Sequence, residues 1–302
     1  MHTDELTKRG YFSLVKKQIE DMYKESGNLK VTLIAHSMGA PTSLYFLNTD
    51  NGIVTQQWKD QYIHAYITLS GAWAGSPITV QEVISGNNLG KFYLPSFIFD
   101  KLFRNVSRTL ESVVWLFPYP SVFNDIIVYT PTKNYSASDY VKLFNDIRYP
   151  VGYSMYKGVE NIREIPDPKV PTHCYWGLGT KTPLSYRYDK EFPVDPGHDP
   201  SNTTYSDGDG AVNKMASEAC LKWSSTTLVQ NKTFEGVAHV NMVKNDAVLE
   251  EIAKVVTNVV PKSMSHPKPS DGMFRITKNH GLTTYNAVRR MIRKMVQMMV
   301  RI

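Results

Sequence analysis

The sequence contains little of what marks membrane proteins, disulfide scaffolds or disordered chains. Its 302 residues include only two cysteines, Cys174 and Cys220, too few for a disulfide scaffold and not spaced as a CxxC metal pair. No apolar run approaches the roughly 18 residues that a membrane-spanning helix needs. The first nine residues are charged and lack an apolar segment, so we expect no signal peptide in the chain. With 42% hydrophobic and 21% charged residues, the composition excludes disorder and predicts a globular protein.

Excess charge is also missing from most of the chain. The net charge is +6, but residues 262–302 contain nine Lys or Arg and one Asp, so the other 261 residues sum to −2. The main body therefore offers no electrostatic reason to bind nucleic acid. The tail, 262–302, has an apolar helical stripe beside clustered arginines, a pattern typical of a basic amphipathic helix on an anionic membrane. An exposed appendage without such a role is the alternative.

Apolar periodicity predicts alternating helices and strands outside one long insertion. The expected helices cover 11–26, 38–48 and 249–256, and the expected strands cover 31–35, 65–70, 172–176 and 226–229. This alternation predicts an α/β fold with a parallel sheet. Residues 86–168 are too apolar for a linker and too irregular for sheet, which indicates an inserted subdomain. The predicted division is therefore a core of 1–85 and 169–261, an insertion at 86–168 and a tail at 262–302.

The strongest chemical signal is the pentapeptide AHSMG at 35–39, between a buried strand and a helix. This context is typical of a nucleophile elbow, in which a sharp turn projects the hydroxyl of a serine, here Ser37. The N–H of Met38, at the start of the helix, could then stabilise an oxyanion. The alternative is a strand–turn–helix junction with an incidental serine.

A catalytic serine needs a base, and the base needs an acid that orients it. The turn SDGDG at 206–210 and the turn GVAH at 236–239 follow successive predicted strands, in the chain order serine, acid, histidine. We favour Asp209 over Asp207 as the acid. A solvated turn is the alternative, whereas a calcium loop fails because Val212 stands where the obligatory glycine belongs.

His239 is the histidine that lies beyond the last predicted strand and before the last helix, so we predict it as the base. The competing histidines are His36, His64, His173 and His198. A lone histidine in an apolar stretch is more often a packed core residue, and His36 is expected to point away from the serine at the elbow.

Six motifs together resemble the lecithin:cholesterol acyltransferase family over about residues 8–260, and its lysosomal phospholipase type most. They are Tyr11–Gly39, WKDQYI at 58–63, GAWAG at 71–75, TPTKNY at 130–135, DGDGAVN at 207–213 and HVNM at 239–242. The resemblance implies an α/β-hydrolase fold in which the chain supplies the C-terminal half of the parallel sheet and 86–168 form a cap for acyl chains.

The same resemblance implies a reaction. An acyl chain would move from a glycerophospholipid to Ser37 and then to water or a lipid alcohol, with Asp209 and His239 as acid and base, Met38 as an oxyanion donor and Trp73 at the substrate. It implies no cofactor, no calcium and no metal site. Its implied partners are a phospholipid membrane or lipoprotein surface and a lipid alcohol acceptor, with no nucleic acid. It also implies a Cys174–Cys220 disulfide and a lysosomal or secreted location.

Four glycosylation sequons fit a secretory history, although the chain shows no leader; they begin at Asn105, Asn134, Asn202 and Asn231. The N-terminal strands, lid and second oxyanion loop of the family have no counterpart here, which suggests a truncated catalytic core with an unpaired edge beside strand 31–35. The principal alternative function is therefore a truncated or non-catalytic lipid-binding relative. An esterase or peptidase for small soluble substrates is a further alternative, which the apolar insertion disfavours.

Overall fold

Four parallel strands form the sheet on which the motifs lie. The computed structural model describes residues 10–87 and 96–257. The strands follow the order β1 (Val31–His36), β2 (Ile63–Leu69), β5 (Thr172–Leu178) and β8 (Val229–Glu235), and every pair of neighbours is parallel. Within the described residues, β1 forms one edge of this sheet and β8 the other. The predicted parallel α/β sheet is confirmed.

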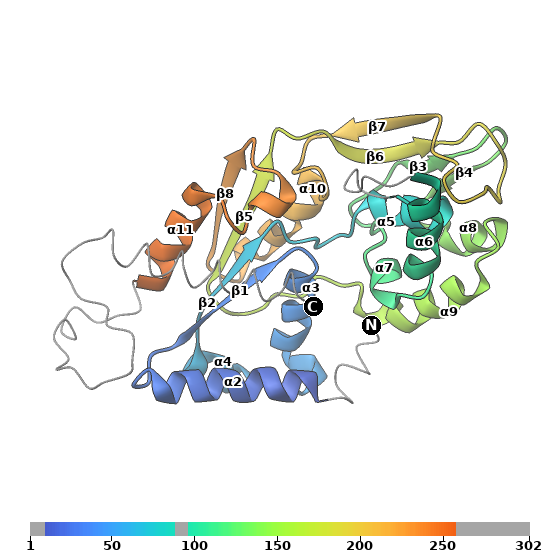
Figure 1. The fold of residues 1–302 in the computed structure, drawn as a ribbon. Helices are drawn as coiled ribbons and strands as arrows, with labels where there is room; N and C mark the ends of the chain where they lie inside the picture. Colours follow the sequence, from blue (N-terminus) through green and yellow to red (C-terminus); the bar gives the residue numbers. More distant parts are fainter. Residues whose placement is uncertain (1–9, 88–95, 258–302) are drawn as a thin grey trace.

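Helices cover both faces of this sheet, as parallel strands require. On one face, β2 and β5 share an apolar cluster with α11 (Asp246–Thr257). On the other face lies α3 (Gly39–Leu47), where the Tyr66 hydroxyl donates to the Ala40 carbonyl at 2.6 Å. Figure 1 shows the sheet between α11 and α3. The remaining helices of this part are α2 (Tyr11–Glu25), η1 (Thr49–Asn51), α4 (Gln56–Tyr62), α10 (Lys214–Ser217), η3 (Glu218–Ser225) and η4 (His239–Asn241).

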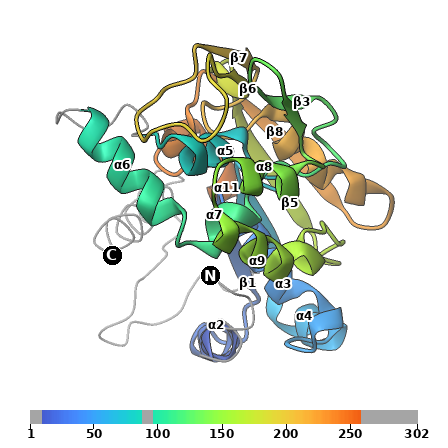
Figure 2. The ribbon, with the colours of Figure 1, turned by 90° about the vertical axis from the view of Figure 1, so that its right-hand side faces the viewer.

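A second group of elements, which we call the cap, lies beside the parallel sheet (Figures 1 and 2). Its helices are α5 (Pro77–Ile84), α6 (Ser96–Ser107), α7 (Glu111–Trp115), α8 (Tyr140–Asp146), α9 (Pro150–Val159) and η2 (Glu160–Ile162). Its four-stranded sheet has the order β4 (Asn134–Ser136), β3 (Ile126–Tyr129), β6 (Thr182–Arg187) and β7 (Asn202–Ser206). The β3–β6 pair is parallel and the other two pairs are antiparallel.

Two sequence expectations differ from the structure. The insertion was expected to contain no sheet, yet β3 and β4 lie within it and pair with each other, and β3 also pairs with β6 from beyond residue 168. The cap therefore draws on both sides of the predicted boundary at 168. The last strand was expected at 226–229, but it begins at Val229 and ends at Glu235. Most of its side chains are exposed because β8 is an edge strand, and this removes the apolar pattern that sequence reading depends on.

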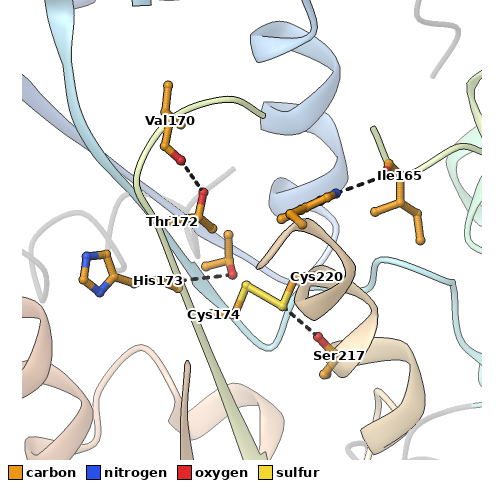
Figure 3. Close-up of a disulfide and its surroundings, with 9 residues drawn as sticks. Ile165, Val170, Thr172, His173, Cys174, Ser217 and Cys220 are labelled. Atoms are coloured by element: carbon orange, nitrogen blue, oxygen red, sulfur yellow. Dashed lines mark hydrogen bonds between the residues drawn. A yellow bond between two sulfur atoms is a disulfide. The ribbon is translucent and has the colours of Figure 1, made fainter. Parts of the chain in front are cut away.

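A disulfide joins Cys174 of β5 to Cys220 of η3, as the resemblance implied (Figure 3). Both cysteines are buried, and the Trp223 indole next to them donates to the Ile165 carbonyl at 3.1 Å. The 46-residue separation means that the bond closes a loop containing β6, β7 and the Asp209 turn. No helix within 10–87 or 96–257 has the length and apolar character needed to cross a membrane. The predicted amphipathic tail helix lies outside the described residues.

Candidate active site

Ser37 sits in the turn between β1 and α3. Its φ of 56° lies in the left-handed region, which a non-glycine residue rarely adopts. The turn is nevertheless tied into the sheet, because the Ser37 N–H donates to the Leu69 carbonyl of β2 at 3.0 Å. A serine with this strained conformation between a parallel strand and a helix has the geometry of the nucleophile elbow of the α/β-hydrolase fold, which this chain adopts.

Asp209 lies in the loop after β7 and is 1% exposed. Its Oδ1 accepts the N–H groups of Ala211 at 3.0 Å and Val212 at 2.8 Å. Burial alone would raise the pKa of this carboxyl. The hydrogen bond and charge of His239, aided by Ser70 and the Val212 N–H, instead hold the pKa below its usual range. Asp209 is therefore ionised at neutral pH.

Asp207 makes different contacts from Asp209. Its Oδ1 accepts the N–H groups of Gly179 at 2.9 Å and Gly208 at 2.8 Å, so its carboxylate holds the turn together. Of the two candidate acids, Asp209 is the one whose carboxylate meets the histidine.

His239 begins η4 and lies between the other two residues. Its Nδ1 is 2.7 Å from Asp209 Oδ2, and its Nε2 is 2.8 Å from Ser37 Oγ. The backbone is held as well, because the His239 N–H donates to the Asp209 carbonyl at 2.8 Å. Since an ionised carboxylate only accepts, Nδ1 carries the proton in neutral His239 and Nε2 is left to accept from the serine.

The other candidate histidines lie apart from Ser37, except one. His64 lies at the start of β2, His173 at the start of β5, and His198 pairs with Asp189 at 2.7 Å in a loop of the cap. His36 was expected to point away from the serine, and its ring lies beside that of His239, with the two centroids 4.6 Å apart. Sequence reasoning missed this contact.

Other predicted site residues occupy contrasting positions. Met38 is the N-terminal cap residue of α3 and its side chain is 38% exposed. Trp73 is 1% exposed and packs edge-on against Trp223 and Tyr66, so its ring lies within the core. The four sequon asparagines are all exposed: Asn105, Asn134, Asn202 and Asn231. A further site residue that the sequence did not indicate is Ser70, which is fully buried and acts on the pKa of Asp209.

Comparison with known proteins gives a consistent result. The family model described as lecithin:cholesterol acyltransferase matches residues 4–164 and 154–266. The phosphatidylcholine-sterol acyltransferase of Gallus gallus is 35% identical over 244 residues, covering 79% of this chain and 56% of the relative. The lysosomal phospholipase A and acyltransferase of Mus musculus is 35% identical over 256 residues, covering 82% and 58%. The chain thus spans a little over half the length of these curated relatives.

Solved structures are more distant. The Tle4–Tli4 complex aligns with a TM-score of 0.49 at 10% identity, covering 85% of this chain and 66% of that chain. This similarity is too low to add to the topology described above.

Proposed function

Since the chain belongs to the lecithin:cholesterol acyltransferase family, we propose that Ser37, Asp209 and His239 are a catalytic triad for acyl transfer from a glycerophospholipid. The observation that carries the proposal is a continuous chain of hydrogen bonds. It joins Asp209 Oδ2 to His239 Nδ1 at 2.7 Å and His239 Nε2 to Ser37 Oγ at 2.8 Å. An acid, a base and a nucleophile in hydrogen-bond contact are the requirement for activating a serine.

The reaction runs in two halves. His239 Nε2 takes the Ser37 hydroxyl proton while Oγ attacks the ester carbonyl carbon, and the carbonyl oxygen becomes an oxyanion. The Met38 N–H, at the start of α3, stabilises that oxyanion. When the C–O bond breaks, the proton passes from His239 to the departing lysophospholipid oxygen and leaves an acyl ester on Ser37. Water or a lipid alcohol then repeats the cycle as the attacking group. The scheme needs no calcium or cofactor, and an assay in EDTA checks its independence from calcium.

Exposed apolar side chains beside the triad support a lipid substrate. Met38, next to Ser37, is 38% exposed, and Val240, next to His239, is 49% exposed. These side chains would contact a membrane or lipoprotein surface or the acyl chain itself, since burying them in lipid removes apolar area from water. The cap would hold acyl chains, and Trp73 stays a proposed substrate-site residue although its ring packs in the core against Trp223 and Tyr66.

The location that we propose is a lysosome or the extracellular space. The buried disulfide and four exposed sequon asparagines support an oxidising, glycosylating route. Peptide-N-glycosidase digestion of the secreted or lysosomal protein tests this proposal.

The test of the triad uses a fluorophosphonate probe and phosphatidylcholine liposomes. Ser37→Ala should abolish labelling and lower acyl release by about 10⁴- to 10⁶-fold, because it removes the attacking oxygen. Ser13→Ala, on the exposed face of α2, is the matched control and should behave as the parent. A folded parent that is neither labelled nor active would show the alternative, a non-catalytic lipid-binding relative. Ser37→Ala activity within tenfold of the parent would reject Ser37 as the nucleophile.

A further inference from the structure

His36, the last residue of β1, reaches across the site to the histidine loop. Its Nε2 lies 3.0 Å from the backbone carbonyl oxygen of His239, a residue 203 positions away. The two imidazole rings also contact each other, with centroids 4.6 Å apart and planes inclined by 38°. Because a carbonyl oxygen only accepts, the hydrogen bond requires the proton of His36 to be on Nε2.

This contact completes the restraint on the His239 backbone. The N–H of His239 donates to the Asp209 carbonyl at 2.8 Å, while its carbonyl accepts from His36 at 3.0 Å and from the Met242 N–H at 3.3 Å. The Met242 bond belongs to the local turn of η4, whereas the His36 bond ties that turn to β1. Since Ser37 is the next residue after His36, this bond sets the histidine loop against the strand that presents the serine.

The protonation state of His36 is compatible with its contact with His239. Burial, together with the nearby charge of His239, lowers the pKa of His36 to about 4, although the hydrogen bond to the His239 carbonyl and the charge of Asp209 act in the opposite direction. His36 is therefore neutral at neutral pH. When His239 becomes an imidazolium during proton transfer, its ring faces a neutral imidazole. A second cation at this distance would repel it and cost free energy.

We propose that His36 is a positioning residue that holds the His239 loop, and through it Nε2 of His239, at bonding distance from Ser37 Oγ. It does not touch substrate, and its effect on the reaction passes through His239. This inference rests on the proposed function.

Two amide substitutions test it as a matched pair. In His36→Gln the side-chain nitrogen occupies nearly the position of Nε2 and can still donate to the His239 carbonyl. In His36→Asn the nitrogen is one bond too short, with the same chemistry and polarity. Loss of one hydrogen bond of about 1–1.5 kcal/mol in the reacting geometry corresponds to about a tenfold fall in rate. We expect kcat of His36→Asn to fall about tenfold at unchanged KM, and that of His36→Gln to stay within about threefold of the parent.

The outcomes separate this inference from the proposed function. If the parent is neither labelled nor active, the proposed function fails and this inference fails with it. An active parent with equal kcat in both variants overturns the role of His36 and leaves the triad standing. A rise in KM without a fall in kcat also overturns the role of His36 and leaves the triad standing. Folding of both variants is checked by circular dichroism, and if neither folds, His36 serves stability and the proposal is rejected.

Discussion

Asp209 and Asp207 are two residues apart in one turn, yet their carboxylates have different hydrogen-bond partners. Asp207 accepts only backbone N–H groups in the contacts described, from Gly179 and Gly208, and an asparagine oxygen can accept the same bonds. Asp209 accepts a hydrogen bond from His239 at 2.7 Å, and in the proposed reaction the charge of its carboxylate would stabilise the imidazolium that forms there. Only the second role depends on a negative charge.

We therefore expect Asp209→Asn and Asp207→Asn to differ strongly. Asp209→Asn should lower kcat by about 10³- to 10⁴-fold, because an amide can donate to Nδ1 and favour the wrong tautomer of His239. Asp207→Asn should stay within about threefold of the parent. Initial rates on phosphatidylcholine liposomes, corrected for the fraction of folded protein, measure both. The reverse ranking would show that Asp207 is the functional acid.

The three residues of the proposed triad could be singled out from the sequence because each stands in a distinctive local setting. Ser37 follows an apolar strand in a short motif, and Asp209 and His239 follow later strands in the required order. The contacts of His36 and Ser70 could not be predicted. They depend on how the end of each strand is turned toward loops more than a hundred residues away, and no local pattern records that direction.

Arg163 connects the elements of the cap. Its guanidinium donates to the carbonyls of Val114 at 3.0 Å and Trp115 at 3.2 Å, and to those of Phe117 at 3.0 Å and Pro118 at 2.9 Å. These carbonyls lie at and beyond the C-terminal end of α7, where a helix has no partners of its own for them. The guanidinium also lies 4.3 Å from the ring centroid of Tyr119.

Arg163→Lys should therefore destabilise the protein although it keeps the charge. An ammonium cannot reach four carbonyls from one plane or stack on a ring in the same way, so buried acceptors lose their donors. We expect the free energy of unfolding to fall by about 2–4 kcal/mol, measured by urea denaturation. Arg148→Lys is the control, because Arg148 is exposed on the same cap, and it should change stability by less than about 0.5 kcal/mol. Equal effects of the two variants would contradict this account of Arg163.

Burial explains which elements sequence reading found. The strands predicted at 31–35, 65–70 and 172–176 are confirmed as β1, β2 and β5, and β2 and β5 are almost wholly buried and mostly apolar. The predicted strand 226–229 was wrong because β8 is an exposed edge with polar residues along most of its length. The cap strands are three to six residues long and pair across the chain, so their register comes from tertiary packing and not from local periodicity.

Two partly buried groups give the whole molecule opposing responses to acid. Burial raises the pKa of Glu82 on α5 to about 7 from 4.5, against a weak hydrogen bond from Ser107 at 3.5 Å. The folded state therefore binds the Glu82 proton more tightly than the unfolded state does. The stabilisation that this proton gives is complete below pH 4.5 and is lost as the pH rises to 7. His36 acts in the opposite sense. With its pKa lowered to about 4 from 6.5, its contribution is full above pH 6.5 and is lost as pH falls to 4.

Removing the charge of Glu82 should therefore change stability at one end of this range only. Glu82→Gln should raise Tm by a few degrees at pH 7.5. At that pH the folded parent must either keep an ionised carboxylate away from water or take up a proton, and both cost free energy of folding. The underlying gain is at most about 3 kcal/mol, and it is smaller than that because the side chain retains some contact with solvent. At pH 4.5 the parent carboxyl is protonated and neutral like the amide, so the two Tm values should agree. Differential scanning calorimetry at both pH values measures this, with Glu25→Gln on the exposed face of α2 as the control that should alter neither. An equal shift in Tm at both pH values would mean that Glu82 acts through packing. The pH dependence of stability would then have to come from His36 and the other titrating groups.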